Sequence, residues 1–167
     1  MKSEVDLLVD LQEVLVDRPG VVPGARTLSH FGEHALGWMA VAALGAAVDK
    51  RRRRQWVGVG VSAFASHAAS VVIKRVVRRK RPHDPRIRVG VGTPSRLSFP
   101  SSHATSTAAA LTSLSSLSGS AMPLAGIPVM MVSRMVLGVH YPTDTLAGAL
   151  LGVATSRAVT TMERKIA

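Results

Sequence analysis

The chain has 167 residues, 47% of them apolar, which fits one domain that is either a packed soluble core or a membrane protein with short spans. Its 21 Lys and Arg outnumber 10 Asp and Glu, for a net charge of +11. The expected partners are therefore anionic: nucleic acid, acidic lipid headgroups or phosphorylated substrates. No cysteine is present, which excludes disulfides, thiolate metal sites and a cysteine nucleophile.

The segment 1–17 predicts an amphipathic helix. Positions 7, 8, 11, 14 and 15 are apolar and fall on one face, whereas positions 6, 10, 13 and 17 are acidic and fall on the other. The acidic residues argue against a cleavable signal peptide. Because carboxylates are costly in hydrocarbon, we expect this helix at the membrane interface or packed on a partner, with an ordinary surface helix as the alternative.

Five apolar stretches follow, at 35–48, 56–73, 104–117, 121–137 and 143–159. Most are shorter than the roughly 20 residues of a clean span, and singly they suit a soluble bundle. Small residues recur at close-approach spacing, as at 148 and 152, which favours membrane packing and permits self-association or docking onto a partner enzyme. No alternating run argues for a sheet. The sequence thus predicts an all-α membrane-embedded bundle of about five to six helices, with its core at 35–159, in a single domain over 1–167.

Two linkers, 49–55 and 74–88, hold 13 of the 21 basic residues. The first, "DKRRRRQ", predicts a solvated turn anchored to anionic headgroups. A nucleic-acid patch is the alternative, but 4% aromatic residues leave little for base stacking, so no nucleic acid is expected as a partner. In the second linker, Lys74 and Arg81 are seven residues apart, which predicts that both project from one face of a helix ending at Pro82 and grip one phosphate.

The motif "FPSSHATSTAAAL" at 99–111 predicts a helix start. Ser101 and Ser102 offer a capping hydroxyl and free N–H groups, which together make an anion site. His103 falls in the first turn, where a bound phosphate would keep its ring protonated. A plain serine cap beside a surface histidine is the alternative.

The segment "SRMVLGVHYPTD" at 133–144 places a cation, an imidazole and a carboxylate between apolar runs. Arg134 lies near the end of one expected helix, Gly138 breaks that helix and Pro142 starts the next. Asp144 follows His140 by four residues, close enough to accept a hydrogen bond from Nδ1–H and leave Nε2 as a nucleophile. A buried structural His–Asp pair is the alternative.

These three segments resemble the signature of the type 2 phosphatidic acid phosphatase (PAP2) superfamily, which also includes the vanadium haloperoxidases. The matching residues span 74–144 and are Lys74, Arg81, Pro82, Pro100, Ser101, His103, Ser133, Arg134, His140 and Asp144. One departure is Ser102, where the family usually has glycine; its amide still donates to phosphate, but its side chain narrows the pocket.

The resemblance implies a phosphatase that needs neither metal nor cofactor. His140 attacks phosphorus to form a phosphohistidine, Asp144 orients it, and His103 protonates the leaving group and then activates water. Charge on the phosphate oxygens is neutralised by a separate set: Lys74, Arg81, Ser101, the amide of Ser102, and Arg134. A vanadate-dependent oxidase is disfavoured because so few aromatic residues are available for a halide pocket. A non-catalytic scaffold for anionic lipids would have no use for the two histidines.

Alternating helices would bring the three motifs to one membrane face and put 51–54 and the C-terminal "RKIA" on the other. Basic residues flank the two faces almost equally, so the sequence does not fix the leaflet at which the site opens. A site at a membrane face suits a lipid-linked phosphate, and a bacterial plasma membrane is the expected location.

Two segments, "LSHFGEHALGW" at 28–38 and "FPSSHATSTAAA", resemble actinobacterial members of the superfamily proposed to dephosphorylate decaprenylphosphoryl-5-phosphoribose, a cell-wall arabinan precursor. Phosphatidic acid, phosphatidylglycerophosphate and polyprenyl pyrophosphate are the alternative substrates. Glu33 and His34 are expected to form a helix cap or interfacial pair, with a sugar contact as the alternative. His67 is expected to hydrogen-bond between helices, and His30 and His83 to lie at the surface.

Overall fold

The computed structural model describes residues 2–166, and the expected domain ends, Met1 and Ala167, lie outside them. Three 3₁₀ turns, η1 (Glu33–Ala35), η2 (Lys50–Arg52) and η3 (Met122–Ala125), connect the helices. Within residues 2–166 the only strand-like pairing is one bridge between Lys80 and Leu97. The α-helices, which confirm the all-α class, are α1 (Glu4–Leu15), α2 (Val21–Phe31), α3 (Leu36–Val48), α4 (Arg53–Val77), α5 (Ser102–Ser118), α6 (Gly126–Val136) and α7 (Pro142–Ile166).

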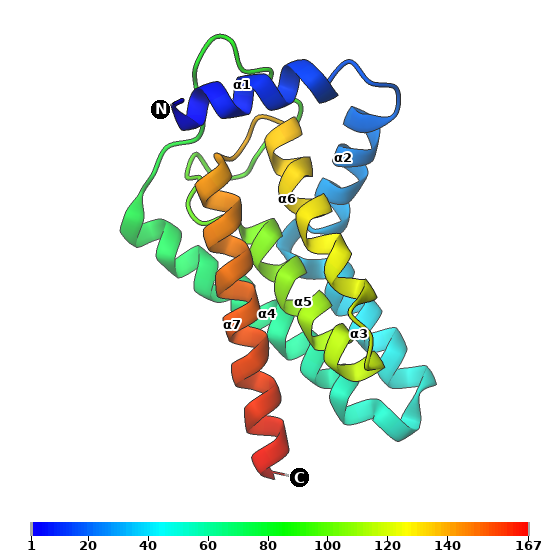
Figure 1. Cartoon of the computed structure of the whole chain (residues 1–167). Helices are drawn as coiled ribbons and strands as arrows, with labels where there is room; N and C mark the ends of the chain where they lie inside the picture. The colour runs from blue at the N-terminus through cyan, green and yellow to red at the C-terminus, as the bar shows by residue number, and fades with distance from the viewer. Residues whose placement is uncertain (1, 167) are drawn as a thin grey trace.

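Helix α5 forms the centre of the bundle, between α4 and α7 (Figure 1). Close approach depends on the glycines of α7: a Cβ at Gly152 would lie 2.2 Å from the backbone oxygen of Thr105, and one at Gly148 would lie 2.7 Å from that of Ser101. Deeper in the bundle the hydroxyl of Ser113 is hydrogen-bonded to two buried serines of α4 and α7. These small residues therefore pack inside the chain, so they give no support to the self-association or partner docking that the sequence permitted.

Helix α1 lies across the end of the bundle (Figure 1). A capping box between Ser3 and Asp6 starts it, and its buried residues Leu8 and Gln12 face α6 and the loop 78–101. The Gln12 amide donates to the carbonyl oxygens of Arg88 and Val136 at 2.8 and 2.9 Å. The N-terminal helix therefore packs on the end of its own bundle, an arrangement that differs from the expected contact with a partner.

Helix α2 was not expected from the sequence. Gly20 directly precedes the helix, and Pro23 and Gly24 lie in its first turn. Glycine and proline are typical of turns rather than helices. Tertiary packing overrides that preference, because Ala25 joins a buried cluster with Val136, Leu137 and Val139. The helix count exceeds the expected five to six for this reason.

Helix α4 ends earlier than expected. It stops at Val77, and Arg78 adopts a left-handed conformation with φ of 53°. The expectation that Lys74 and Arg81 share one helical face is therefore wrong. Pro82 disfavours helical backbone at Arg81, and four successive cations at 78–81 repel one another on a helix.

The segment Lys50–Val77 is the one described helix long and apolar enough to cross a membrane, with mean hydropathy of 1.6 in its best 18-residue window. The bent pair α2 and α3, with a 50° bend, passes the same test when counted as one span. Apolar side chains stay exposed along α4, including Phe64 at 60% and Val76 at 77%. In a membrane protein such a face contacts lipid.

Candidate active site

A cavity of about 510 Å³ opens where α4 ends and α5 begins. All three sequence motifs reach it, although they come from α4, the loop 78–101, α5, α6 and the loop after α6. Ser101 and Asp144 are fully buried directly behind its wall. The expected site residues that line the cavity itself are Lys74, Arg81, Ser102, His103, Arg134 and His140.

His140 is 2% exposed and lies in the loop between α6 and α7. Its Nε2 is 3.2 Å from Nη1 of Arg81. A guanidinium only donates, so Nε2 is the accepting nitrogen and the proton of the neutral ring lies on Nδ1. Burial, together with the charges of Arg81, Arg134 and Lys74, holds the pKa of His140 well below its usual value. The ring is therefore neutral with an available lone pair, which is the state a nucleophile requires.

The expected hydrogen bond from His140 to Asp144 is not formed. Nδ1 lies 3.6 Å from Oδ2 of Asp144, beyond hydrogen-bonding distance, and it has no other partner in the described part of the chain. Asp144 is held elsewhere: Oδ2 accepts from the backbone N–H of Tyr141 at 2.8 Å and Oδ1 accepts from Arg79 at 3.0 Å. The carboxylate is thus positioned below the imidazole without bonding to it.

The three expected phosphate-binding cations sit in surroundings that disfavour their charge. Arg134 is 1% exposed, and its Nε and Nη1 have no hydrogen-bond partner among the described residues. Lys74 donates to two backbone carbonyls of the loop 78–101, at Ser98 and Pro100. Burial lowers the pKa of Arg81 to about 10 even though Asp144 acts in the opposite direction. Buried cations with so little counter-charge favour binding of an anion.

The start of α5 is built as expected, with Ser101 as its N-cap accepting from the N–H of Ala104. His103 lies in the first turn, and its Nε2 is 2.9 Å from the carbonyl oxygen of Ser29 on α2. Nε2–H therefore donates to Ser29, and Nδ1 is the ring nitrogen left for other chemistry. The hydroxyls of Ser102 and Ser70 are 2.8 Å apart, so this hydroxyl is directed to α4.

Arg79 is a site residue that sequence reasoning missed. It bonds Asp144 and also Glu4 of α1, and its guanidinium carbon lies 4.1 Å from the ring centroid of Tyr141. Glu4 in turn accepts from the N–H and the hydroxyl of Thr143 at 3.0 and 2.6 Å. Nothing in the sequence distinguishes Arg79 from the other cations at 78–81, because its role depends on the packing of α1.

The remaining histidines divide between the cavity and the surface. His34 and Glu33 line the cavity rather than forming a hydrogen-bonded cap. His67 also lines it, and its Nδ1 is buried without a partner in the described chain. The expectation that His67 bonds between helices is wrong because its ring faces the cavity. His30 and His83 are exposed, as expected, with His30 at the cavity rim.

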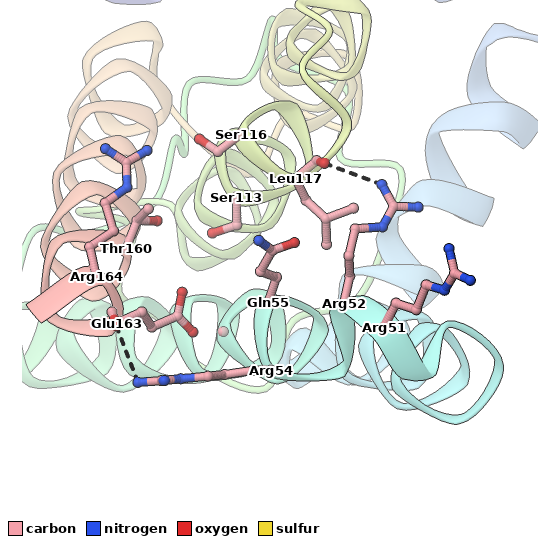
Figure 2. A pocket seen from close by; sticks show the side chains of 11 residues that line it. Arg51, Arg52, Arg54, Gln55, Ser113, Ser116, Leu117, Thr160, Glu163 and Arg164 are labelled. Carbon is pink, nitrogen blue, oxygen red and sulfur yellow. Dashed lines mark hydrogen bonds between the residues drawn. The ribbon is translucent and has the colours of Figure 1, made fainter. Parts of the chain in front are cut away.

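A second hollow, of about 250 Å³, lies at the opposite end of α4 and α5 (Figure 2). It contains the basic residues expected on the face away from the site, including Arg51 and Arg164. Arg52 donates to the carbonyl oxygen of Leu117 and Arg54 to that of Glu163. These arginines therefore cap the C-terminal ends of α5 and α7. Among the described residues that line it there is no histidine, so it lacks the candidate nucleophile that lines the first cavity.

The chain belongs to the PAP2 superfamily, whose family model matches residues 55–166. This range contains all three motifs. It is 58% identical over 147 residues to decaprenylphosphoryl-5-phosphoribose phosphatase of Mycolicibacterium smegmatis, covering 88% of this chain and 82% of that protein. It is 52% identical over 151 residues to the protein of the same name from Mycobacterium tuberculosis H37Rv, covering 90% and 85%.

Two solved structures share the fold. The transmembrane PAP2 type phosphatidylglycerolphosphate phosphatase of Bacillus subtilis has a TM-score of 0.74 at 21% identity, covering 97% of this chain and 87% of that one. Aquifex aeolicus LpxE has a TM-score of 0.75 at 16% identity, covering 93% of each chain. The expected class, an integral membrane lipid phosphatase with a PAP2 helical bundle, is confirmed.

Proposed function

We propose that this protein hydrolyses the 5-phosphate of decaprenylphosphoryl-5-phosphoribose at the bacterial plasma membrane, through a phosphohistidine on His140 and without a metal ion. One observation carries the mechanism: the two histidines and three cations of the motifs, which come from separate parts of the chain, line a single cavity. The substrate is supported by the two mycobacterial relatives, which share that printed name.

In the first step, Nε2 of His140 forms a bond to phosphorus while the bond from phosphorus to the ribose oxygen breaks. His103, whose ring carries a second proton on Nδ1 once the phosphate is bound, gives that proton to the departing oxygen. The His140 ring becomes cationic, and the carboxylate of Asp144, 3.6 Å from Nδ1, stabilises that charge and orients the ring. Catalytic contacts commonly shorten once substrate is bound.

In the second step, His103 takes a proton from a water molecule whose oxygen attacks phosphorus, and the bond to His140 breaks to release inorganic phosphate. The transferred group carries its charge on three equatorial oxygens in both steps. Lys74, Arg81 and Arg134 neutralise that charge, with Ser101 and the Ser102 amide at the positive end of α5. Fixed cations thereby supply what Mg²⁺ supplies in kinases.

We also propose that residues 1–167 act as one phosphatase domain. Glu4 in α1 is linked through Arg79 to Asp144, so the N-terminal helix supports the site. The cavity opens at an end of the bundle, which supports a substrate that has its phosphate at headgroup depth and its polyprenyl chain in lipid.

The test is release of inorganic phosphate by detergent-purified protein in EDTA. The substrates are decaprenylphosphoryl-5-phosphoribose, phosphatidic acid, phosphatidylglycerophosphate and polyprenyl pyrophosphate. His140→Ala is the inactive variant, and His83→Ala, which removes an exposed histidine outside the cavity lining, is the matched control. Preferred release from the phosphoribosyl lipid, lost only in His140→Ala, supports the proposal. Preference for another lipid would overturn the substrate, and dependence on metal would overturn the mechanism.

A further inference from the structure

The cavity extends beyond the phosphate-binding residues to His67 on α4. His67 precedes Lys74 by seven residues in the same helix, so the two side chains share a face about 10 Å apart along the axis. The Nδ1 atom of His67 is buried and makes no hydrogen bond within the described chain. His67 also lines the cavity, and a ring that the protein leaves without hydrogen bonds beside a cavity can bind a ligand there.

The opposite wall of this part of the cavity is the turn η1, which contains His34 and Glu33. His34 and Ala35 both adopt left-handed backbone conformations, with φ of 51° and 62°. Two successive non-glycine residues in this region are costly and occur where surrounding structure enforces them, often at ligand sites. The turn brings the His34 ring to 6.0 Å from that of His67, measured between centroids.

Two imidazoles and a carboxylate suit hydroxyl groups. A neutral imidazole offers one donor and one acceptor, and a carboxylate accepts from a hydroxyl. Their acceptor atoms would repel the oxygens of a phosphate, whereas the lysine and arginines at the other end of the cavity attract them. The two parts of the cavity therefore differ chemically. A group of several hydroxyls next to a phosphate is the arrangement found in a phosphosugar.

A separate apolar groove lies between α3 and α4, on the side of His67 away from Lys74 along α4. It is lined by Met39, Ala42, Val61 and Phe64, among others, and has a volume of about 330 Å³. Phe64 lies one helical turn from His67 on α4. Along α4 the order is thus a phosphate-binding cation, a polar ring and an apolar groove, which matches a substrate with phosphate at one end and a hydrocarbon chain at the other.

We propose that His67, His34 and Glu33 form a subsite for the sugar hydroxyls of the substrate and make the enzyme selective for a phosphosugar lipid. This inference rests on the proposed phosphatase function and identifies the residues that would recognise the sugar of its substrate. His67 is the principal residue of the three, because it lines the cavity and its ring makes no hydrogen bond within the described chain.

The first test measures binding by calorimetry in the His140→Ala protein, which cannot turn over. The affinity for ribose 5-phosphate is compared with that for inorganic phosphate, first in this protein and then in the double variant that also carries His67→Phe. The His67→Phe substitution keeps an aromatic ring but removes its nitrogens. The expected result is a loss of about tenfold in affinity for ribose 5-phosphate, with inorganic phosphate unchanged. His67→Asn in place of His67→Phe should retain part of the affinity for ribose 5-phosphate. His83→Phe, as the control, should change neither affinity.

Equal affinities for the two ligands in the His140→Ala protein, or an unchanged ratio after His67→Phe, would overturn the subsite. Loss of both ligands would show a structural role and overturn it as well. If His67→Phe does not fold, Glu33→Gln and His34→Ala, at exposed positions, give the same ratio test.

A catalytic measurement separates this inference from the proposed function. With His140 intact, His67→Phe should lower kcat/KM for the phosphoribosyl lipid about tenfold and leave phosphatidic acid hydrolysis unchanged. Wild-type protein that binds ribose 5-phosphate selectively but releases no phosphate from the lipid would contradict the proposed function while leaving the subsite in place. Wild-type protein that hydrolyses the lipid but binds ribose 5-phosphate no better than inorganic phosphate would contradict the subsite while leaving the proposed function in place.

Discussion

The two ends of the bundle both carry several arginines beside a hollow, yet only one has the features of an anion site. At the catalytic end Arg134 is 1% exposed, with two nitrogens unbonded among the described residues. At the opposite end Arg52 and Arg54 are exposed and donate to carbonyl oxygens (Figure 2). The number of cations therefore does not define the site. Burial without counter-charge does, because it leaves cations that only a bound anion can neutralise.

Helix α5 reinforces this difference. Its N-terminus, with Ser101 as cap, meets the catalytic cavity, and its C-terminal residues Ser116 and Leu117 line the other hollow. The partial positive charge at a helix start attracts phosphate, whereas the partial negative charge at its end attracts cations. One helix thus prepares one end for a substrate and the other for arginine side chains.

The largest contrast is expected from removing one arginine at each end. Arg134→Met should lower kcat by about 10²- to 10³-fold, the usual effect of losing a transition-state charge partner. The same change should raise the thermal midpoint of ligand-free protein, because it removes a buried uncompensated charge. Arg54→Met at the far end should leave kcat unchanged. Comparable losses in both variants would refute the distinction between the ends.

Arg79 tests whether Asp144 needs support from outside the motifs. Arg79→Ala removes the donor that holds Oδ1 of Asp144 at 3.0 Å, and a misplaced carboxylate should lower kcat about 10- to 100-fold with little change in KM. Arg79→Lys should recover part of the rate. Initial-rate kinetics on the phosphoribosyl lipid provide the measurement, and an unchanged kcat in Arg79→Ala would show that Asp144 is held without it.

The pH dependence of the free energy of unfolding should report on the buried histidine at the cavity end of the bundle. His140 has a folded pKa well below the ordinary 6.5, so the unfolded chain takes up its proton first. Above about pH 6.5 His140 is neutral in both states, and the free energy of unfolding does not depend on its titration. As the pH falls from 6.5 toward the folded pKa, the free energy of unfolding decreases by up to about 1.4 kcal/mol per pH unit. Thermal unfolding from pH 7.5 to 5 should show a shallower decline in His140→Gln than in wild type. Parallel declines would contradict this assignment.

The smallest effect is expected at the far end. Arg52 is exposed and makes an ion pair with Asp49 at 2.6 Å and a 3.4 Å bond to the carbonyl of Leu117. Arg52→Ala should cost less than about 1 kcal/mol of unfolding free energy and leave phosphate release intact. Chemical denaturation in detergent and the phosphate assay measure the two quantities. A large loss of activity would mean that this hollow communicates with the site.

The sequence by itself predicted the all-α class, the break at Gly138 between α6 and α7, and the cap at Ser101. Each depends on local chemistry: apolar periodicity, a left-handed glycine, and a serine hydroxyl at a helix start. Six of the residues that line the cavity were also identified from motifs, since their types and spacing match a known signature. Local signals therefore carried the prediction of which residues gather at the site.

Only the tertiary structure decided how those residues are held. Helix α2 forms against its local turn signals, α4 stops before Arg81, and Arg79 rather than His140 bonds the carboxylate of Asp144. For α2 and for Arg79 the deciding contacts join residues far apart in the chain, as when Glu4 reaches Arg79. Long-range packing and charge pairing have no periodicity or spacing that a linear sequence displays, because they exist only once the helices are in place.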